Sequence, residues 1–578
     1  MTQKSTKKHA VRAALVGAAF FLWLVLIGAR AGYLQIYRGA WLSSKAAVQY
    51  EQELTLTGKR GTIYDACNQA MAVSIETTSL AAYPAKLADK RKAAAGLAKA
   101  LHLSRRDLLK KFSKNRSFVW IKRQATPKET AAVRKLALEG VDFLPEHSRF
   151  YPNTTLAAQV LGFTGIDGHG LEGVEFYYDS QLKGGQNKVT VLKDALGRGF
   201  ESEGWSALQQ AGNNLVLTLD GHIQFITEQA LAEAVSAHKA RSGMAIVMAP
   251  QTGAVLAMAH YPLFNPNNFG RYDRSAWRNR AITDPFEPGS TMKVFSAASA
   301  LESGASKPNT IFYCENGSYL IGRHTINDTK PHGWLSLQQI VKYSSNIGAV
   351  KVAQKLGAES LYGHLRAFGF GRSTSIDCPG ESVGSLSDFK RWSALDTGSI
   401  AFGQGVSVTA LQLVTAAAAL ANDGVMMQPY ILQAVTDPNG RLIQSTEPRV
   451  VRQVVSAQTA RTVRHIMRTV VTDGGTGVQA DLEGYTVCGK TGTAQKIDRT
   501  GTYSKDRYVA SFLGFAPTEH PALVVLVVVD EPDDIKYGGT VAAPAFKQIV
   551  KETLSYLNIA PSNGFRKLRV ANKGGGSG

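Results

Sequence analysis

Seventeen uncharged residues near the N-terminus, from Ala13 to Ala29, leave this part of the chain few structural options. A helix needs about 20 mainly apolar residues to cross a bilayer, and AGYLQIY continues the apolar character beyond Arg30. Ala29-Arg30-Ala31 also resembles the small-x-small site of a cleaved signal peptide. Because the run is longer than a usual signal core, and because Arg30 disfavours cleavage there, we expect an uncleaved membrane anchor over residues 13–37.

The charges beside this run predict its orientation. Basic residues precede the anchor and hold the N-terminus in the cytoplasm, so that residues 1–12 form a cytoplasmic tail and the bulk of the chain is exported. They are Lys4, Lys7, Lys8 and Arg12. The whole chain carries a net charge of +20, which favours anionic partners. Export excludes nucleic acid, so we expect the membrane, a lipid-linked substrate or a wall polymer to be the partner.

Cysteine usage excludes two kinds of protein. The four cysteines, Cys67, Cys314, Cys378 and Cys488, are widely spaced and form no CxxC pair. A disulfide-rich scaffold is therefore ruled out and no metal-ligand spacing is present, although a single disulfide stays open.

Residues 38–220 are predicted to form a stalk and a pedestal domain. Residues 38 to about 60 read as a juxtamembrane stalk, and from Arg60 short strand-like runs alternate with helical ones. Lysine and arginine are dense between Lys86 and Lys122, a pattern typical of a solvated helix face and, less often, of a docking surface. The tail at 558–578 ends in KGGGSG, which resembles an engineered linker and is left out of the fold prediction.

Residues 221–557 are predicted to form one α+β domain. Two apolar runs flank Pro250-Gln251-Thr252-Gly253, which indicates a hairpin. Three further strands are expected at 485–493, 509–516 and 522–530, with helices at Ser290–Glu302, Ala410–Ala421 and Ala457–Val471 between them. Strands at both ends of a domain with helices between them favour a sheet that distant segments close.

Three short motifs occur in this domain in a fixed order. Ser290-Thr291-Met292-Lys293 is followed by Ser344-Ser345-Asn346 and then by Lys490-Thr491-Gly492-Thr493. Ser-x-x-Lys alone means little, because it also begins at Ser5, Ser180, Ser236 and Ser387. The ordered set of three motifs is specific.

The chemistry of the first motif follows from its residues. A serine hydroxyl is a poor nucleophile and needs an adjacent base. Residues i and i+3 of a helix share a face, so Lys293 can reach Ser290, and burial lowers the pKa of a lysine toward its neutral, basic form. Pro288-Gly289 gives a tight helix entry, where the helix dipole stabilises a developing oxyanion. The plain alternative is an N-cap serine followed by a solvated lysine.

The chain resembles the class B penicillin-binding proteins, and within them the division-type (septal) D,D-transpeptidases. FEPGSTMK, SSN and KTGT are similar to the active-site motifs of penicillin-binding proteins and serine β-lactamases. The narrower resemblance rests on RGTIYD (60–65), RFYP (149–152), GLEGVE (170–175), RNRA (278–281) and YGGTVAAPAF (537–546). It covers nearly the whole chain to about residue 557. One departure is Cys488, at a position where a small residue is usual and where a buried thiol should fit.

The resemblance implies an architecture and a reaction. The fold would be an N-terminal transmembrane helix, an elongated mixed α/β pedestal region resembling a dimerisation domain, and a C-terminal penicillin-binding transpeptidase domain with a central antiparallel sheet flanked by helices. Ser290 would attack the D-Ala-D-Ala amide of a peptidoglycan stem peptide, and an amine of a neighbouring stem would resolve the acyl-enzyme. β-Lactams would mimic the donor. No metal or other cofactor is implied.

The resemblance also implies a role for each site residue. Lys293 would be the base, Ser344 would relay a proton to the leaving amine, and Asn346 would hydrogen-bond the substrate backbone. Lys490, Thr491 and Thr493 would bind the terminal carboxylate, and Gly492 would permit close approach of the substrate. Backbone N–H groups of Ser290 and Thr493 would form the oxyanion hole.

The same resemblance places the enzyme at the cytoplasmic (inner) membrane with its catalytic domain on the periplasmic side. A membrane glycosyltransferase of the SEDS family and other division proteins are the expected partners, since the chain has no polymerase motif of its own.

Four alternatives differ in substrate or class. A side-wall (elongation) transpeptidase shares the same motifs, and a serine β-lactamase or D,D-carboxypeptidase shares the catalytic set but usually lacks so long an N-terminal region. A β-lactam sensor would bind without turnover, yet His-Glu-x-x-His, the zinc-protease signature of such sensors, is absent. A scaffold protein would not need all three motifs.

Overall fold

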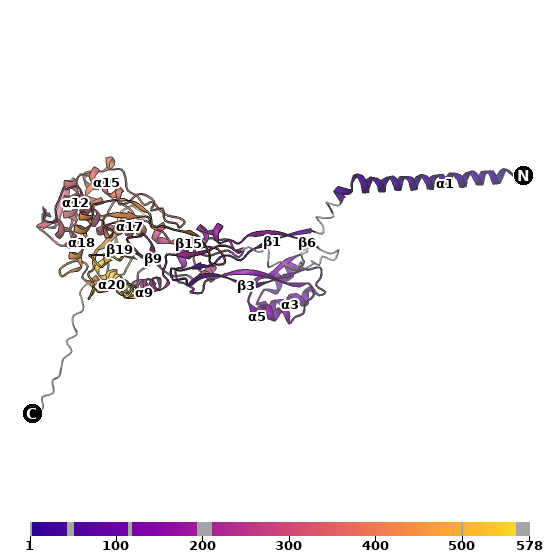
Figure 1. Ribbon diagram of the computed structural model, residues 1–578, viewed down its shortest axis with the longest axis horizontal. Coiled ribbons are helices and arrows are strands. Elements are labelled where there is room, and N and C mark those ends of the chain that lie inside the picture. The colour runs from indigo at the N-terminus through magenta and orange to yellow at the C-terminus, as the bar shows by residue number, and fades with distance from the viewer. Residues whose placement is uncertain are drawn as a thin grey trace, which may run out of the picture. The chain divides into compact units, whose positions relative to one another are not determined.

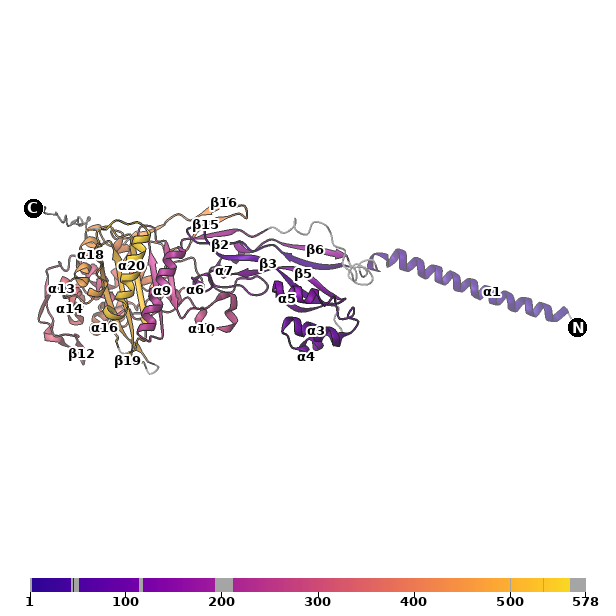
Figure 2. The same cartoon turned by 90° about the horizontal axis from the view of Figure 1, so that it is seen from below.

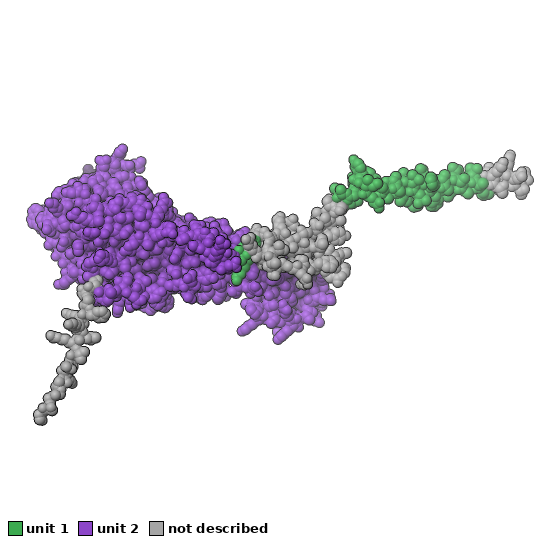
Figure 3. Space-filling view, in the orientation of Figure 1, with its two compact units in different colours: residues 1–59, 184–211 green, residues 60–183, 212–578 purple. Residues whose placement is uncertain are grey.

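The computed structural model describes residues 3–42, 45, 51–113, 118–192, 211–498, 501–533 and 535–561. Two compact units form: residues 1–59 together with 184–211, and residues 60–183 together with 212–578 (Figure 3). The predicted domain boundary at residue 220 stays a prediction, because these units divide the chain elsewhere. The predicted linker at the end of the C-terminal tail lies outside the described residues.

The first unit contains the predicted anchor. Helix α1 spans Gln3–Gly32 and continues into a π-helical turn, Tyr33–Tyr37. The segment His9–Tyr37 is long and apolar enough to cross a membrane, and none of its most apolar stretch is buried against protein. Strand β1 (Glu51–Thr57) then pairs antiparallel with β6 (Gln186–Leu192). An exposed helix full of large apolar side chains needs a lipid environment, so the apolar N-terminal helix is confirmed.

A seven-stranded sheet in the second unit joins segments that are far apart in the sequence. Its strands follow the order β16-β15-β7-β2-β3-β4, and β5 also pairs with β3. Strands β16, β15, β2, β3 and β5 are labelled in Figure 2. The strands are β2 (Ile63–Tyr64), β3 (Ala70–Ala82), β4 (Val119–Ala125), β5 (Val141–Phe150), β7 (Asn214–Leu217), β15 (Leu432–Thr436) and β16 (Leu442–Ser445). This sheet makes the pedestal region continuous with strands of the C-terminal half.

Three helices pack at the far end of β3 and β5 and form what we call the head. They are α3 (Lys90–Leu101), α4 (Arg105–Ser113) and α5 (Pro127–Arg134) (Figure 2). Leu97, Leu101 and Phe112 are fully or almost fully buried with Leu80 and Ile121 of the strands. The helical character predicted for this lysine-rich region is present, and its apolar faces supply a separate small core.

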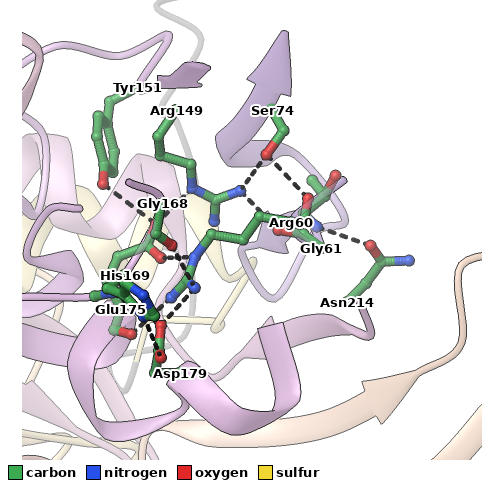
Figure 4. Close-up of polar contacts among 12 residues, drawn as sticks. Arg60, Gly61, Ser74, Arg149, Tyr151, Gly168, His169, Glu175, Asp179 and Asn214 are labelled. Atoms are coloured by element: carbon green, nitrogen blue, oxygen red, sulfur yellow. Dashed lines mark hydrogen bonds and ion pairs between the residues drawn. The ribbon is translucent and has the colours of Figure 1, made fainter. Parts of the chain in front are cut away.

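A buried ion network ties three of the pedestal motifs together (Figure 4). Arg60 Nε donates to Glu175 Oε2 at 2.7 Å and Arg60 Nη1 to Asp179 at 2.6 Å. Arg149 Nε donates to the other Glu175 oxygen at 2.6 Å, and the Tyr151 hydroxyl reaches it at 3.2 Å. Glu175 is fully buried, so one carboxylate is shared by two nearly buried guanidinium groups. RGTIYD, RFYP and GLEGVE therefore meet in space.

The predicted C-terminal sheet has five strands in the order β18-β19-β20-β8-β9, all antiparallel. They are β18 (Cys488–Ile497), β19 (Tyr503–Ala516), β20 (Leu523–Asp530), β8 (Ser242–Met248) and β9 (Val255–Tyr261). The hairpin β8-β9 from the start of the domain pairs with β20 from its end. The expected closure by distant segments is confirmed, and β18 is an edge strand.

Helices cover both faces of this sheet. Val525, Val527 and Val529 of β20 pack with α9 (Gly221–Ala237) and α20 (Ala543–Tyr556), which lie side by side (Figures 1 and 2). Leu526 and Val528 point to the opposite face and join a core that includes α12 (Met292–Glu302) and α17 (Ala410–Ala421). Because alternate residues of a strand face opposite sides, a strand buried on both faces reads as an unbroken apolar run, as VVLVVV does.

The predicted helix at Ala457–Val471 is α18, and that at Ser290–Glu302 is α12, Met292–Glu302, with a 3₁₀ turn at Gly289–Thr291. The smaller helices are α6 (Ala158–Leu161), α7 (Gly173–Tyr177), α8 (Asp179–Leu182), α10 (Arg274–Trp277), α11 (Arg280–Thr283), α13 (Leu337–Tyr343), α14 (Asn346–Leu356), α15 (Ala358–Ala367), α16 (Ala394–Ala401) and α19 (Gly538–Val541). Short strands pair as β10 (Ile311–Tyr313) with β13 (Trp334–Ser336), β11 (Ser318–Ile321) with β12 (His324–Asn327), and β14 (Val425–Met427) with β17 (Val450–Gln453).

Candidate active site

Ser290 lies in a tight turn ahead of a helix, and it is not a helix cap. Gly289 has φ +55°, a left-handed conformation that favours glycine, and a Cβ there would lie 3.1 Å from the Thr493 carbonyl oxygen. The turn is 3₁₀, so Ser290 precedes α12 by two residues instead of starting it. Neither helix start has a side-chain cap. The plain N-cap interpretation of Ser290 therefore has no support in the geometry.

Lys293 lies behind Ser290 and is 2% exposed. Its Nζ is 3.0 Å from Ser290 Oγ, 2.6 Å from the Ser344 carbonyl oxygen and 2.7 Å from Asn346 Oδ1. A neutral amine has two N–H donors and one lone pair. In that form the carbonyl and the amide oxygen can accept the two N–H donors, and the lone pair can then accept the proton of Ser290.

The electrostatic environment of Lys293 favours this neutral form. Burial lowers the pKa of Lys293 to about 7, and the carboxylate of Asp328 partly opposes that shift. Desolvation disfavours the charged amine, and no carboxylate is in direct contact with it among the described residues. At neutral pH a substantial share of the protein therefore holds an unprotonated base beside the hydroxyl.

Ser344 is held in the left-handed backbone region at the junction of two helices. It follows α13, precedes α14 and has φ 63°. A non-glycine residue in this region costs free energy and marks a position that its surroundings enforce. Ser345 begins α14 with its hydroxyl accepting from the Gly348 N–H at 2.9 Å. The strained turn directs Ser344 Oγ and Asn346 Oδ1 toward Lys293.

Asp328 anchors this turn, and sequence reasoning missed it. Its carboxylate accepts from Ser345 Oγ at 2.6 Å and from the Ile347 N–H at 3.0 Å. Asp328 directly follows β12 and belongs to none of the three motifs. A single aspartate 16 residues before Ser344 carries no local signal, so only the folded chain reveals the contact.

Lys490 completes the group of three motifs from the edge strand. Its side chain is fully buried, and its Nζ donates to Ser344 Oγ at 3.0 Å and to the Thr491 carbonyl oxygen at 3.0 Å. Burial, together with the nearby charge of Lys293, lowers the pKa of Lys490 well below its usual value. Ser344 Oγ is also 3.2 Å from Lys293 Nζ, so one hydroxyl lies between two amines.

The remaining residues of KTGT have partners of their own. Thr491 Oγ1 is 3.0 Å from the hydroxyl of Thr476, and Thr493 Oγ1 accepts from the Gly538 N–H at 3.3 Å. Gly492 packs so tightly on β19 that a Cβ would collide with Ser511 Oγ. Packing within the protein therefore already requires a glycine at position 492. The predicted role of Gly492 in allowing close approach of the substrate stays a prediction.

The cysteines and possible metal ligands add no further chemistry here. All four cysteines are free, and burial raises the pKa of the Cys488 thiol, so it stays protonated within the sheet. Within the described part of the chain, no group of three or more His, Cys, Asp or Glu side chains could hold a metal ion.

Comparison with known proteins places this geometry in a family. A model described as the penicillin binding protein transpeptidase domain matches residues 243–551, more than half of the chain. The chain belongs to the class B penicillin-binding proteins. A second model, the penicillin-binding protein dimerisation domain, matches residues 55–217. The predicted family and its class of reaction, serine-type acyl transfer, are confirmed.

Curated relatives cover almost the full length of this penicillin-binding protein. The probable peptidoglycan D,D-transpeptidase PenA of Neisseria gonorrhoeae is 35% identical over 92% of this chain and 90% of its own. The peptidoglycan D,D-transpeptidase FtsI of Escherichia coli (strain K12) is 33% identical over 98% and 96%. Among solved structures, penicillin binding protein 3 from Mycobacterium tuberculosis, complexed with aztreonam, is 30% identical over 88% of this chain and 98% of its own, with a TM-score of 0.69.

Proposed function

We propose that this penicillin-binding protein crosslinks the stem peptides of septal peptidoglycan as a D,D-transpeptidase, with Ser290 as its nucleophile. One observation carries the proposal: a buried lysine amine lies 3.0 Å from a serine hydroxyl in a partly exposed turn. The curated relatives named as D,D-transpeptidases support the reaction. The choice of septum over side wall rests on the resemblance of the full motif set.

Acylation would begin when Lys293 Nζ accepts the proton of Ser290 Oγ. The oxygen then attacks the carbonyl carbon of the penultimate D-Ala, and the Ser290 and Thr493 N–H groups stabilise the oxyanion. The C–N bond to the terminal D-Ala breaks as Ser344 Oγ gives its proton to the departing amine and receives from Lys293 the proton taken from Ser290, so that Lys293 is neutral again. Asn346 holds the substrate backbone. In the second step the amine of a neighbouring stem attacks the ester and gives up a proton to Lys293, which passes it to Ser290 Oγ as the ester C–O bond breaks.

The terminal carboxylate of the donor would bind beside Lys490, Thr491 and Thr493. A carboxylate supplies the counter-charge that the buried Lys490 lacks, and so favours its protonated form. A second charge on Lys293, near Lys490, is then disfavoured by repulsion. Substrate binding would thus help to keep Lys293 neutral. An extended peptide suits the free edge of β18, where main-chain hydrogen bonds can form.

The basic residues in the first turns of α1, ahead of its apolar run, support an N-terminus in the cytoplasm and a catalytic domain on the periplasmic side. Glycan strands would come from a SEDS-family glycosyltransferase in the same membrane, with other division proteins as further partners. β-Lactams would acylate Ser290 in place of the donor peptide.

Turnover tests this function directly. The full chain, supplied with lipid-linked peptidoglycan precursor and a SEDS glycosyltransferase, should release D-Ala and form crosslinked muropeptides. A sensor or a scaffold would form no crosslinks, and a carboxypeptidase would release D-Ala without crosslinks. Either outcome would overturn the proposal. The position of a fluorescent fusion of this protein decides between division and elongation. Enrichment at the septum would support division, and distribution along the side wall would support elongation.

The pH dependence of acylation should follow Lys293. Below about pH 7 the amine is protonated and cannot accept the Ser290 proton. We therefore expect the rate constant for penicillin acylation to rise with pH through about 7 and to level off above it, as measured by stopped flow between about pH 5 and 9.

The same pH profile of the acylation rate constant should be measured for Asp328→Asn. The Asp328 carboxylate raises the pKa of Lys293, so its neutralisation should move the acid limb to lower pH. The lost anchoring of the turn should also lower the plateau. A profile without an acid limb, or a limb that does not move in Asp328→Asn, would contradict the assignment of Lys293 as the titrating base.

A further inference from the structure

An open, strongly basic groove lies on the head, away from the catalytic motifs. It has a volume of about 780 Å³ and runs between α3 and α4, which pack against each other (Figure 2). Its lining consists of Lys90, Arg91, Arg105, Arg106, Leu109, Lys110 and Ser113. Five of these seven side chains are cations, and none is an acid.

The five cations have little counter-charge within the described residues, where Asp89 acts electrostatically on Arg91 without forming an ion pair with it. All five are exposed, and none forms an ion pair there, whereas the head cations Lys122 and Arg123 are paired with Glu129 and Glu146. The nearby Asp89 is occupied as the N-cap of α3, where it accepts from two backbone N–H groups. The positive charge of the groove is thus left for something outside this chain.

More than half of the net charge of the protein lies in the sequence segment that contains this groove. Residues 86–140 contain sixteen lysines and arginines against four acidic residues, a net charge of +12 out of +20 for the chain. A solvated helix face would intersperse both signs. So strong a bias in one small subdomain creates a positive field that attracts an extended anionic surface.

We propose that this groove docks the head onto anionic phospholipid headgroups of the membrane that holds α1. The lining contains one leucine and no aromatic residue, so it lacks the apolar and aromatic side chains that protein interfaces bury at their centre. The groove is open, so its cations can attract negative charges without requiring a ligand of a particular shape. A membrane surface with many lipid phosphates meets that condition.

The anchor gives the lipid surface an advantage over soluble anions. The continuous described part of the N-terminal helical stretch reaches Leu42 and the second unit begins at Arg60, so the 17 residues between them span at most about 60 Å. Such a tether raises the effective concentration of lipid headgroups near the head. Clusters of lysine and arginine close to a membrane are attracted to anionic lipids, and each such residue strengthens binding roughly five-fold.

The test uses the full chain in vesicles. A Cys67→Ser, Ser104→Cys protein carries a fluorophore in the turn between α3 and α4, and headgroup-labelled lipid serves as the quencher. Vesicles are either neutral or contain about 30 mol% phosphatidylglycerol. We expect at least about two-fold stronger quenching with phosphatidylglycerol, and loss of that difference near 1 M salt, where the Debye length is about 3 Å.

Two charge-reversal variants distinguish an effect of the groove residues from an effect of the net charge of the head. Arg105→Glu/Arg106→Glu/Lys110→Glu should abolish the phosphatidylglycerol effect. Lys99→Glu/Lys128→Glu/Lys135→Glu changes the head charge equally, but none of these residues lines the groove, and it should keep most of the effect. Acidic residues near the start of α4 favour the helix, and an unchanged far-UV circular dichroism spectrum and unfolding transition verify the fold of both proteins.

Equal quenching in neutral and anionic vesicles would overturn the proposal. It would also fail if the control variant lost as much as the groove variant, since net charge alone would then explain the effect. A groove that ignored lipid but bound poly(glycerol phosphate) or an acidic protein segment would have a different partner.

Discussion

Replacement of Lys293 by arginine is expected to slow penicillin acylation at least roughly 10²-fold, since general-base assistance contributes about 10²–10⁴ in rate. Arginine keeps a positive charge and donors at the site, but guanidinium stays protonated in proteins and cannot accept a proton. The loss should appear in the acylation rate constant, because Lys490, Thr491 and Thr493 remain in place to bind the carboxylate. Stopped-flow measurement at saturating penicillin separates that constant from binding.

The matched control is Lys355→Arg, which makes the same change on the exposed face of α14 and should leave acylation unchanged. Arginine could also slow the reaction because it is too large for the site. Lys293→Met tests this, since methionine is neutral and similar in length to lysine, and we expect this variant to lose as much acylation activity as Lys293→Arg. A well-folded Lys293→Arg protein that acylates at a near-normal rate would show that another group activates Ser290, and Ser344 would be the first to examine.

Glu175→Gln is expected to lower the free energy of unfolding of the second unit by about 3–5 kcal/mol. Glu175 is fully buried between Arg60 and Arg149, whose side chains are 7% and 4% exposed. The amide keeps the shape of the side chain but removes the negative charge, which among the described residues is the only one that pairs with both guanidinium groups. Urea unfolding of the full chain in detergent measures the change.

Asp167→Asn is the matched control, because Asp167 pairs with Arg123 while its side chain is 69% exposed. Exposed ion pairs contribute about 0–1 kcal/mol, so this variant should unfold nearly as the parent does. Equal, small effects for both variants would mean that the buried network contributes specificity without stability.

The sequence predicts the C-terminal domain well because its signals are local. VVLVVV alternates between two covered faces, and helices at Ala410–Ala421 and Ala457–Val471 have the predicted ends. The ordered motifs predict that Ser290, Ser344 and Lys490 belong to one site, and the contacts among Lys293, Lys490 and Ser344 bring them together.

What the sequence could not predict depends on contacts between distant segments. Asp328 has no motif of its own, and the left-handed turn at Ser344 is enforced by the packing of α13 and α14. The 3₁₀ turn at Ser290 reflects the close approach of Gly289 to Thr493, which only the folded sheet creates. The pairing of β7 with β2 and β15 likewise joins residues 63–64, 214–217 and 432–436 without any local signal.

The most direct test of the catalytic assignment is the intact mass of the protein after exposure to a penicillin. The parent chain should gain the mass of one drug molecule, and peptide mapping should place it on Ser290. Ser290→Ala should gain nothing, while Ser387→Ala, a change in another Ser-x-x-Lys sequence, should react as the parent does. A Ser290→Ala protein that still acquired the drug's mass would contradict the account.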